Sequence, residues 1–306
     1  MKGFIRTIAG DIRTSEVRYA VTHEHGFLPL NKESASKLKK LKPVIEQRLV
    51  REFKTLLGQG ANTFVDVTPI GYARMTDLWL RASQRTGMHV VATTGYYAEP
   101  TLPPSVRKAS VDKLASVMHK ELVDGIGDTG CRAGIVKVAT HEYEILPTEK
   151  KIFLAAAAVQ KKTGCPITTH SPKATLAEFK MLTEHGVAPE RIALGHIEVS
   201  PWEDVKNVMD KGAMFLFTNF GGVDIVPEDV VIAQMADLIR RGHLRQIMIS
   251  VDMYIYAKKG RLVYRWPGGY EQLIGRVVPR MVKYGIKPRH IETMLHENPA
   301  RHLAWQ

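Results

Sequence analysis

The chain has 306 residues, of which 44% are hydrophobic and 24% charged, an ordinary globular balance that excludes disordered, collagen-like and low-complexity proteins. No apolar run approaches the roughly 18 residues of a membrane span, and charges interrupt the N-terminus early, so we expect neither a transmembrane helix nor a secretory peptide. The net charge of +12 would suit nucleic acid, an anionic membrane or an anionic substrate, but more often it marks only a basic surface.

Two cysteines, Cys131 and Cys165, are too few for a disulfide scaffold and too isolated for a cysteine zinc site. We expect free thiols in a reducing compartment and therefore a cytoplasmic protein. The densest basic segment, 32–54, carries apolar residues at helical spacing, which predicts a helix with a solvated basic face. No nucleic-acid motif accompanies it. We expect a small-molecule substrate, a homodimer, and no binding to nucleic acid or membrane.

Short apolar runs alternate with amphipathic segments along the chain. The predicted strands are 19–22, 63–67, 89–94, 134–139, 166–169, 192–194, 213–217 and 246–251. The predicted helices between them are 44–57, 75–86, 111–123, 148–162, 173–185, 201–211 and 228–241. Eight such repeats predict an α/β fold of the closed (β/α)8, or TIM barrel, class. An open doubly wound sheet is the alternative, but no glycine-rich dinucleotide fingerprint follows the first strand.

Residues 1–18 lie outside the repeat. They predict a short N-terminal β-hairpin of strands 3–9 and 17–20 joined through Gly10-Asp11, an extension that can cover the bottom of a barrel. No proline-rich or glycine-rich linker divides the chain. We therefore predict a single domain, 1–306, in which residues 19–306 form the barrel.

Chemically active side chains end several predicted strands, the face on which barrels of this class carry their active sites. His23 and His25 end the first strand, and residues two apart on a strand point to the same side. Both imidazoles can therefore face one metal ion. His170, His196 and Asp252 end later strands. A single strand-end histidine is more often a core residue, but the joint pattern favours a metal centre.

Lys137 lies among aliphatic residues in the fourth predicted strand. A buried charged lysine is costly, which leaves an ion pair, a lowered pKa or covalent modification, unless the side chain reaches solvent. A neutral amine can add carbon dioxide and become a carbamate, a bidentate anion able to bridge two metals. The pattern alone does not choose among these alternatives.

The ordered set of motifs resembles the phosphotriesterase family of the amidohydrolase superfamily over nearly the whole chain. The matching segments are Val21-Thr22-His23-Glu24-His25, 132–140, Thr168-Thr169-His170, Gly195-His196, Ser250-Val251-Asp252 and Asn298-Pro299-Ala300-Arg301. The resemblance implies a binuclear centre of divalent ions, zinc first, with cobalt, manganese or iron as alternatives. The implied ligands are His23, His25, Lys137, His170, His196 and Asp252.

In that family pattern His23, His25 and Asp252 match the residues that hold one ion, and His170 and His196 match those that hold the other. A carboxylated lysine matching Lys137 bridges the ions together with a hydroxide. Two ions lower the pKa of a shared water and polarise a carbonyl or phosphoryl oxygen, while Asp252 would move the proton toward the leaving group. All of these parts serve hydrolysis.

The expected class of substrate depends mainly on Tyr97. In members resembling quorum-signal lactonases, a tyrosine at this place contacts the lactone ring, so Tyr97 is expected to act in both catalysis and substrate binding. This favours a lactonase or carboxylic-ester hydrolase with promiscuous phosphotriesterase activity. Those lactonases also carry an arginine in the loop after the seventh strand, whereas 218–224 has none. Phe220 from that loop is an expected substrate contact.

The segment 253–270, after the eighth strand, is the second candidate for substrate contacts. Tyr254, Tyr256 and Trp266 would form an apolar wall. The four cations of the segment could instead meet a phosphate or carboxylate, and the sequence leaves this open. The alternative functions are a dedicated phosphotriesterase and a non-catalytic metal-binding barrel. The six filled ligand positions argue against lost catalysis.

Overall fold

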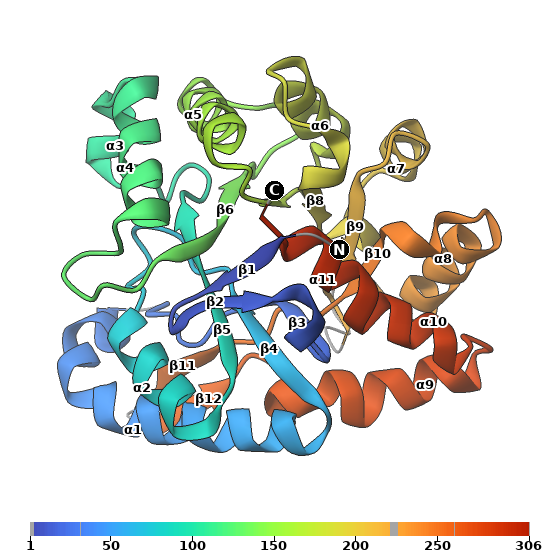
Figure 1. The fold of residues 1–306 in the computed structure, drawn as a ribbon, viewed down its shortest axis with the longest axis horizontal. Coiled ribbons are helices and arrows are strands. Elements are labelled where there is room, and N and C mark those ends of the chain that lie inside the picture. Colours follow the sequence, from blue (N-terminus) through green and yellow to red (C-terminus); the bar gives the residue numbers. More distant parts are fainter. Residues whose placement is uncertain (1–2, 31, 221–225, 260, 306) are drawn as a thin grey trace.

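A computed structural model describes residues 3–30, 32–220, 226–259 and 261–305, and its centre is a parallel sheet ringed by helices (Figure 1). Within this part of the chain the strands are β3 (Tyr19–Glu24), β4 (Ala61–Asp66), β5 (His89–Gly95), β6 (Ala133–Ala139), β7 (Ile167–His170), β8 (Ile192–Gly195), β9 (Met214–Phe217) and β10 (Ile247–Ile249). They form one 8-stranded sheet in sequential order from β3 to β10. This confirms the predicted (β/α)8 barrel.

Helices follow the strands around the outside of the sheet (Figure 1). They are α1 (Lys32–Gly58), α2 (Thr76–Thr86), α3 (Pro104–Lys108), α4 (Val111–Val123), α5 (Pro147–Thr163), α6 (Thr175–Glu184), α7 (Trp202–Met209), α8 (Glu228–Arg240), α9 (Val278–Lys283), α10 (Pro288–Glu292) and α11 (Asn298–Leu303). Short π-helical segments, Leu273–Val277 and Thr293–Glu297, lead into α9 and α11. No described helix is both long and apolar enough to cross a membrane.

Helix α1 is longer than the predicted 44–57 helix, because it begins at Lys32 and continues through Pro43. Its buried face is mostly apolar, with Ile45, Leu49 and Phe53 packed against the barrel, and Glu52 is the buried charged residue on it. Its lysines face solvent where side chains are described. The expected solvated basic face of the 32–54 segment is therefore confirmed, and burial of one apolar stripe explains why the helix forms.

The N-terminal hairpin is present, but its predicted second strand was wrong. β1 (Phe4–Thr7) pairs antiparallel with β2 (Gly10–Arg13), not with residues 17–20. Gly10 has φ +130°, and the Thr7 hydroxyl donates to the Gly10 carbonyl at 2.6 Å. The chain therefore reverses at once, and the expected second strand instead leads into β3.

The hairpin covers the end of the barrel at which the strands begin (Figure 1). The Ile8 N–H donates to the Val90 carbonyl at the start of β5. Ile5 packs with Val65, Val91 and other residues of the barrel interior. The first and last described segments meet here, since Trp305 stacks on Phe4. With this end closed, only the opposite end of the barrel is left for chemistry.

Glycine at the end of β5 allows close approach to β6. Gly95 has φ +99°, and a Cβ there would lie 2.0 Å from the Lys137 carbonyl oxygen. The next residue uses that approach, because the Tyr96 N–H donates to the same carbonyl at 3.1 Å. The glycine therefore helps to fix the backbone that carries Lys137.

We predict that Gly95→Ala lowers the free energy of unfolding by roughly 2–5 kcal/mol, because positive-φ strain and a backbone clash add together. The matched control is Gly242→Ala, where φ is +94° but nothing lies within 4 Å of the added Cβ. In that variant only the backbone strain acts, so the free energy of unfolding should fall by about 1–2 kcal/mol. Urea unfolding measures both, and equal losses would contradict the proposed close contact.

Candidate metal centre

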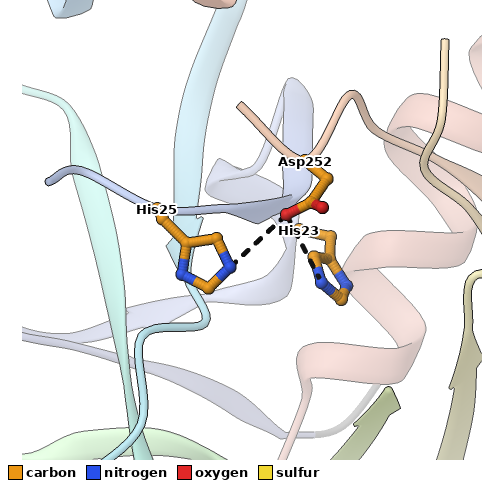
Figure 2. A group of neighbouring side chains, drawn as sticks. All are labelled: His23, His25 and Asp252. Carbon is orange, nitrogen blue, oxygen red and sulfur yellow. Dashed lines mark ion pairs between the residues drawn. The ribbon is translucent and has the colours of Figure 1, made fainter. Parts of the chain in front are cut away.

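Two histidines and an aspartate meet where β3 ends beside the segment that follows β10 (Figure 2). The Nε2 atom of His25 lies 3.4 Å from Oδ1 of Asp252, and that of His23 lies 4.0 Å from the same oxygen. Potential ligand atoms of the three side chains all lie within 4.8 Å of one another. The alternation of β3 turns both imidazoles inward, as the spacing predicted. This cluster could hold a metal ion.

Lys137 lies next to this cluster in the middle of the barrel. Its Nζ is 3.3 Å from His23 Nε2 and 3.3 Å from the Thr169 carbonyl oxygen. The side chain is 1% exposed, and burial lowers its pKa to about 7. In the described part of the chain no carboxylate forms an ion pair with it. Solvent contact and an ion pair are thus removed from the alternatives, which leaves a neutral amine or its modification.

His170 and His196 complete the arrangement. The ring of His196 lies 4.2 Å from that of His170 and 5.0 Å from that of His23, measured between centroids. Burial holds the pKa of His23 and of His170 well below the ordinary value and lowers the pKa of His196 to about 3. These rings are therefore neutral, the form in which imidazole binds a metal.

Two fully buried ring nitrogens in this group have no hydrogen-bond partner among the described residues. They are Nδ1 of His23 and Nε2 of His196, both buried. An unsatisfied buried polar atom is costly. A metal ion would satisfy the Nε2 atom of His196, and the donor set of imidazoles and carboxylate is one that zinc accepts. The residues present therefore fit a metal.

Arg265 contacts both the backbone and the side chain of Asp252. Its Nη1 donates to the Asp252 carbonyl at 3.0 Å and also forms a close ion pair with the carboxylate. Burial opposes ionisation of Asp252, but Arg265 and His25 hold the pKa of that carboxyl well below its usual range. The guanidinium itself lies 4.6 Å above the Trp266 ring. Asp252 is therefore an anion at neutral pH.

Glu24 joins the first and last strands beneath the cluster. It lies between the two inward-facing histidines of β3, so it points the other way. Its Oε1 accepts hydrogen bonds from the Ser250 hydroxyl at 2.7 Å and the Val251 N–H at 3.1 Å, and its Oε2 accepts from the Met253 N–H at 2.6 Å. Burial raises the pKa of Glu24 to about 8 despite these donors. The segment before and after Asp252 is thus tied to β3.

Tyr97 extends over the site from the segment after β5. Its hydroxyl lies 2.8 Å from His170 Nε2, and its ring meets the Tyr72 ring edge-on at 5.7 Å. Burial raises the pKa of Tyr97, so the hydroxyl keeps its proton. If His170 binds an ion through Nε2, this hydroxyl must release the ring and becomes free for another partner.

Two cavities open on the cluster, and both are lined by His170, Asp252 and Arg265. The wider one, about 580 Å³, continues past Lys173 and Tyr143. The narrower one, about 260 Å³, has an aromatic and aliphatic wall. The wall residues are Leu28, Leu30, Pro69, Tyr72, Tyr97 and Tyr254.

The expected substrate contacts fall in different places. Tyr254 lines the narrower cavity, and Tyr256 packs on it with ring centroids 5.9 Å apart. Trp266 lies under Arg265 and lines neither described cavity. Phe220 is fully buried in the core. The rest of its loop, residues 221–225, lies outside the described residues.

The segment 253–270 contains a β-hairpin, β11 (Ile255–Lys258) and β12 (Arg261–Tyr264), which is joined to the chain before α1 through an Ile255–Phe27 bridge. Lys258, Lys259 and Arg261 are exposed at its tip. Of the four cations, only Arg265 lines the two cavities.

Glu24 lies at the end of the first predicted strand but was given no role in the site, and Arg265 was one of four cations whose contact with the substrate the sequence left open. Glu24 had a usable signal, because a residue between two inward-facing ligands must point toward a neighbouring strand. Arg265 had none, because which cation of a loop turns inward depends on the fold of the loop.

Comparison with known proteins gives a match to the model of the phosphotriesterase family over residues 3–303. A phosphotriesterase homology protein of Escherichia coli strain K12 is 30% identical, over 92% of this chain and 97% of that protein. An aryldialkylphosphatase of Saccharolobus solfataricus is 31% identical, over 82% and 83%. An N-acetyltaurine hydrolase of Salmo salar is 24% identical, over 100% and 99%. The family match includes every strand end described above.

We predict that at about pH 9, where Glu24 with its pKa of about 8 is ionised, Glu24→Gln lowers the free energy of unfolding by about 1–3 kcal/mol, because the carboxylate accepts from every donor whereas the amide NH2 faces at least one donor whichever way it turns. Hydrogen exchange at the Val251 and Met253 amides should accelerate. Glu149→Gln is the control, since Glu149 is equally buried and accepts from the Leu146 and Glu99 N–H groups. These groups lie away from the seam, which is the junction between β3 and the segment that follows β10. Unchanged exchange at Met253 in the Glu24 variant would show that the carboxylate does not tie the seam.

Proposed function

This chain belongs to the phosphotriesterase family and is therefore a metal-dependent hydrolase, and from that premise we propose that it uses two divalent ions to hydrolyse lactones or carboxylic esters. The observation that carries the proposal is the buried set of donors at one end of the barrel. Neutral imidazoles, a lysine whose pKa burial lowers to about 7 and one ionised carboxylate lie within a few ångströms of one another. Without a metal, such a set buries polar atoms with no compensating partner.

We assign His23, His25 and Asp252 to one ion and His170 and His196 to the other. The contacts between Asp252 and the first two histidines support the first group, and the adjoining rings of the second pair support the other. Nitrogen and oxygen donors in a closed, partly apolar site suit zinc, with cobalt, manganese or iron as substitutes.

A carboxylated Lys137 would join the two groups. The lone pair of the neutral amine adds to the carbon of carbon dioxide, and one proton leaves the nitrogen for water, so the product is a carbamate anion. Three features support it. The amine lies within 3.3 Å of His23 Nε2, it has no carboxylate partner among the described residues, and its burial disfavours the ammonium form.

The ions, when bound, lower the pKa of water and polarise the bond to be cleaved. Asp252 is the residue placed to accept a proton at the centre and return it to the leaving group, since it is ionised and lines both cavities. Arg265 donates to the backbone carbonyl of Asp252 and lines both cavities. It would bind the carbonyl or carboxylate oxygen of the substrate.

Lactones and carboxylic esters are favoured by the narrower cavity. Tyr72, Tyr97 and Tyr254 give it an aromatic wall, and the Tyr97 hydroxyl stands at the metal-facing end. Lactonases of this kind carry an arginine in the loop after the seventh barrel strand, and the corresponding loop after β9 has none here. Arg265 could make the substrate contact of that arginine instead. Phosphotriester hydrolysis is the second candidate, because a relative is named an aryldialkylphosphatase and the wider cavity has room for a branched ester.

We predict that kcat/KM for a lactone or aryl ester exceeds that for a phosphotriester, and that a chelator abolishes both activities. Discrimination must come from contacts outside the metals, so Tyr97→Phe should reduce lactone turnover roughly tenfold, the scale of one net hydrogen bond. Phosphotriester turnover should fall less. Tyr256→Phe is the control, because Tyr256 lines neither described cavity.

Equal losses on both substrates, or a wild-type preference for phosphotriesters, would remove the lactonase proposal but leave the metallohydrolase standing. Full activity in protein shown to be free of metal would remove the metal proposal itself and favour a different use of the site.

We predict a pH dependence for the rate at which zinc and CO2 restore activity to metal-free, CO2-depleted protein. This rate should rise about tenfold between about pH 6 and about pH 8 and then level off. Only the neutral amine reacts, and burial lowers the pKa of Lys137 to about 7, so the neutral fraction saturates in this range. Dissolved CO2 is held constant, and Lys137→Ala is the inactive control. A rate that still climbs beyond about pH 9 would mean an ordinary lysine.

A further inference from the structure

Two threonine hydroxyls each connect a fully buried carboxylate to a histidine of the centre. The Asp66 relay consists of Asp66, Thr68 and His25. The Glu198 relay consists of Glu198, Thr218 and His196. We propose that these relays are positioning elements that fix the tautomer and direction of one histidine ligand for each ion. The proposal deepens the function proposed above and rests on it for the role of the metals.

In the Asp66 relay, the Thr68 hydroxyl lies 2.5 Å from Asp66 Oδ1 and 2.9 Å from His25 Nδ1. A hydroxyl has one hydrogen, and an ionised carboxylate can only accept. The hydrogen therefore goes to Asp66, and the Thr68 oxygen accepts the proton of Nδ1–H. The lone pair of His25 is left on Nε2, the atom that faces Asp252 at 3.4 Å.

The carboxylate of this relay is itself held rigidly. Asp66 Oδ1 also accepts from the Thr68 N–H at 3.2 Å, and Oδ2 accepts from the Trp79 indole N–H at 2.5 Å. Asp66 ends β4 and is 2% exposed. A fixed acceptor in a low-dielectric surrounding orients the hydroxyl strongly, so the relay holds its direction whether or not a ligand is present at Nε2.

The Glu198 relay repeats the same order of atoms at His196. The Thr218 hydroxyl lies 3.1 Å from Glu198 Oε1 and 2.7 Å from His196 Nδ1. Glu198 also accepts from the Thr218 N–H at 3.2 Å and the Asn219 N–H at 3.0 Å. The Asn219 amide nitrogen is 3.3 Å from the same ring nitrogen, but it donates to Glu198 through a shorter contact.

The consequence for His196 is the same as for His25. Nδ1 carries the proton, and Nε2 keeps a lone pair that is buried without a partner. His23 has no such relay, since its Nδ1 has no hydrogen-bond partner among the described residues. His170 has none either, because the hydrogen bond found for its ring nitrogens among the described residues is the one between Nε2 and the Tyr97 hydroxyl. Each group of ligands therefore contains one histidine whose tautomer is fixed by a threonine hydroxyl at Nδ1.

A structural role alone is the competing explanation, because buried carboxylates also tie neighbouring strand ends together. The two explanations differ in what the hydroxyl does. Threonine-to-valine substitution keeps the shape and removes the hydroxyl, so the carboxylate keeps its backbone donors while the histidine loses its partner. A positioning role predicts weaker metal binding with little change in the fold.

The test uses Thr68→Val and Thr218→Val, with Thr93→Val as the matched control. The Thr93 hydroxyl is buried in β5 and has no hydrogen-bond partner among the described residues. Zinc affinity is measured by competition with a chelator of known affinity, and bound zinc by elemental analysis. Each relay variant should lose about 10–100-fold in affinity for one ion. The double variant should bind both ions weakly, and the control should match the wild type.

Thr68→Ser and Thr218→Ser keep the hydroxyl and should keep the wild-type affinity. The second readout needs no metal: nitrogen NMR of labelled histidine in the metal-free wild type should show His25 and His196 protonated at Nδ1, and the valine variants should lose this preference. Relay variants with wild-type zinc affinity, or wild-type rings protonated at Nε2, would overturn the relays. A wild type that binds no zinc but shows the Nδ1 tautomers would overturn the proposed metals instead.

Discussion

Closure of the barrel at Glu24 is the constraint on which the site depends. In the described sheet β3 stands at one edge and β10 at the other, so His23 and His25 belong to one edge and Asp252 follows the other. The Glu24 carboxylate and the bond from the His25 N–H to the Met253 carbonyl join these edges. The three donors are therefore assembled only when the seam is closed, and a loss at the seam is a loss at the site.

Burial then sets the chemical state of the donors. The same desolvation that lowers the pKa of Lys137 and keeps the inner imidazoles neutral raises the pKa of the carboxyls behind them, to about 7 for Glu178 and about 6 for Glu198. Such groups stabilise the fold little unless every polar atom finds a partner. Hydroxyls such as Thr140, which donates to Glu178 at 2.7 Å, supply many of these partners. The site therefore combines a costly set of polar groups with a rigid frame, a combination typical of positions selected for chemistry.

The strands, and the side chains that end them, could be predicted because period-2 alternation and the ends of apolar runs are local properties of the sequence. The inward direction of His23 and His25 followed from this directly, whereas the pattern left the state of Lys137 open. The partner of β1 and the burial of Phe220 could not, because both depend on how close two backbones approach. The inward turn of Arg265 alone among the cations of its loop depends on the β11–β12 hairpin. The relays through Thr68 and Thr218 join residues of different chain segments, and no spacing rule in one sequence links them.

The most direct test of the central claim is a crystal structure of the zinc-loaded protein with anomalous data collected at the zinc edge. The account predicts two anomalous peaks, one among His23, His25 and Asp252 and one between His170 and His196, with extra density on the Lys137 amine reaching both. A single peak away from these side chains, or two peaks with an unmodified lysine turned away from them, would contradict it.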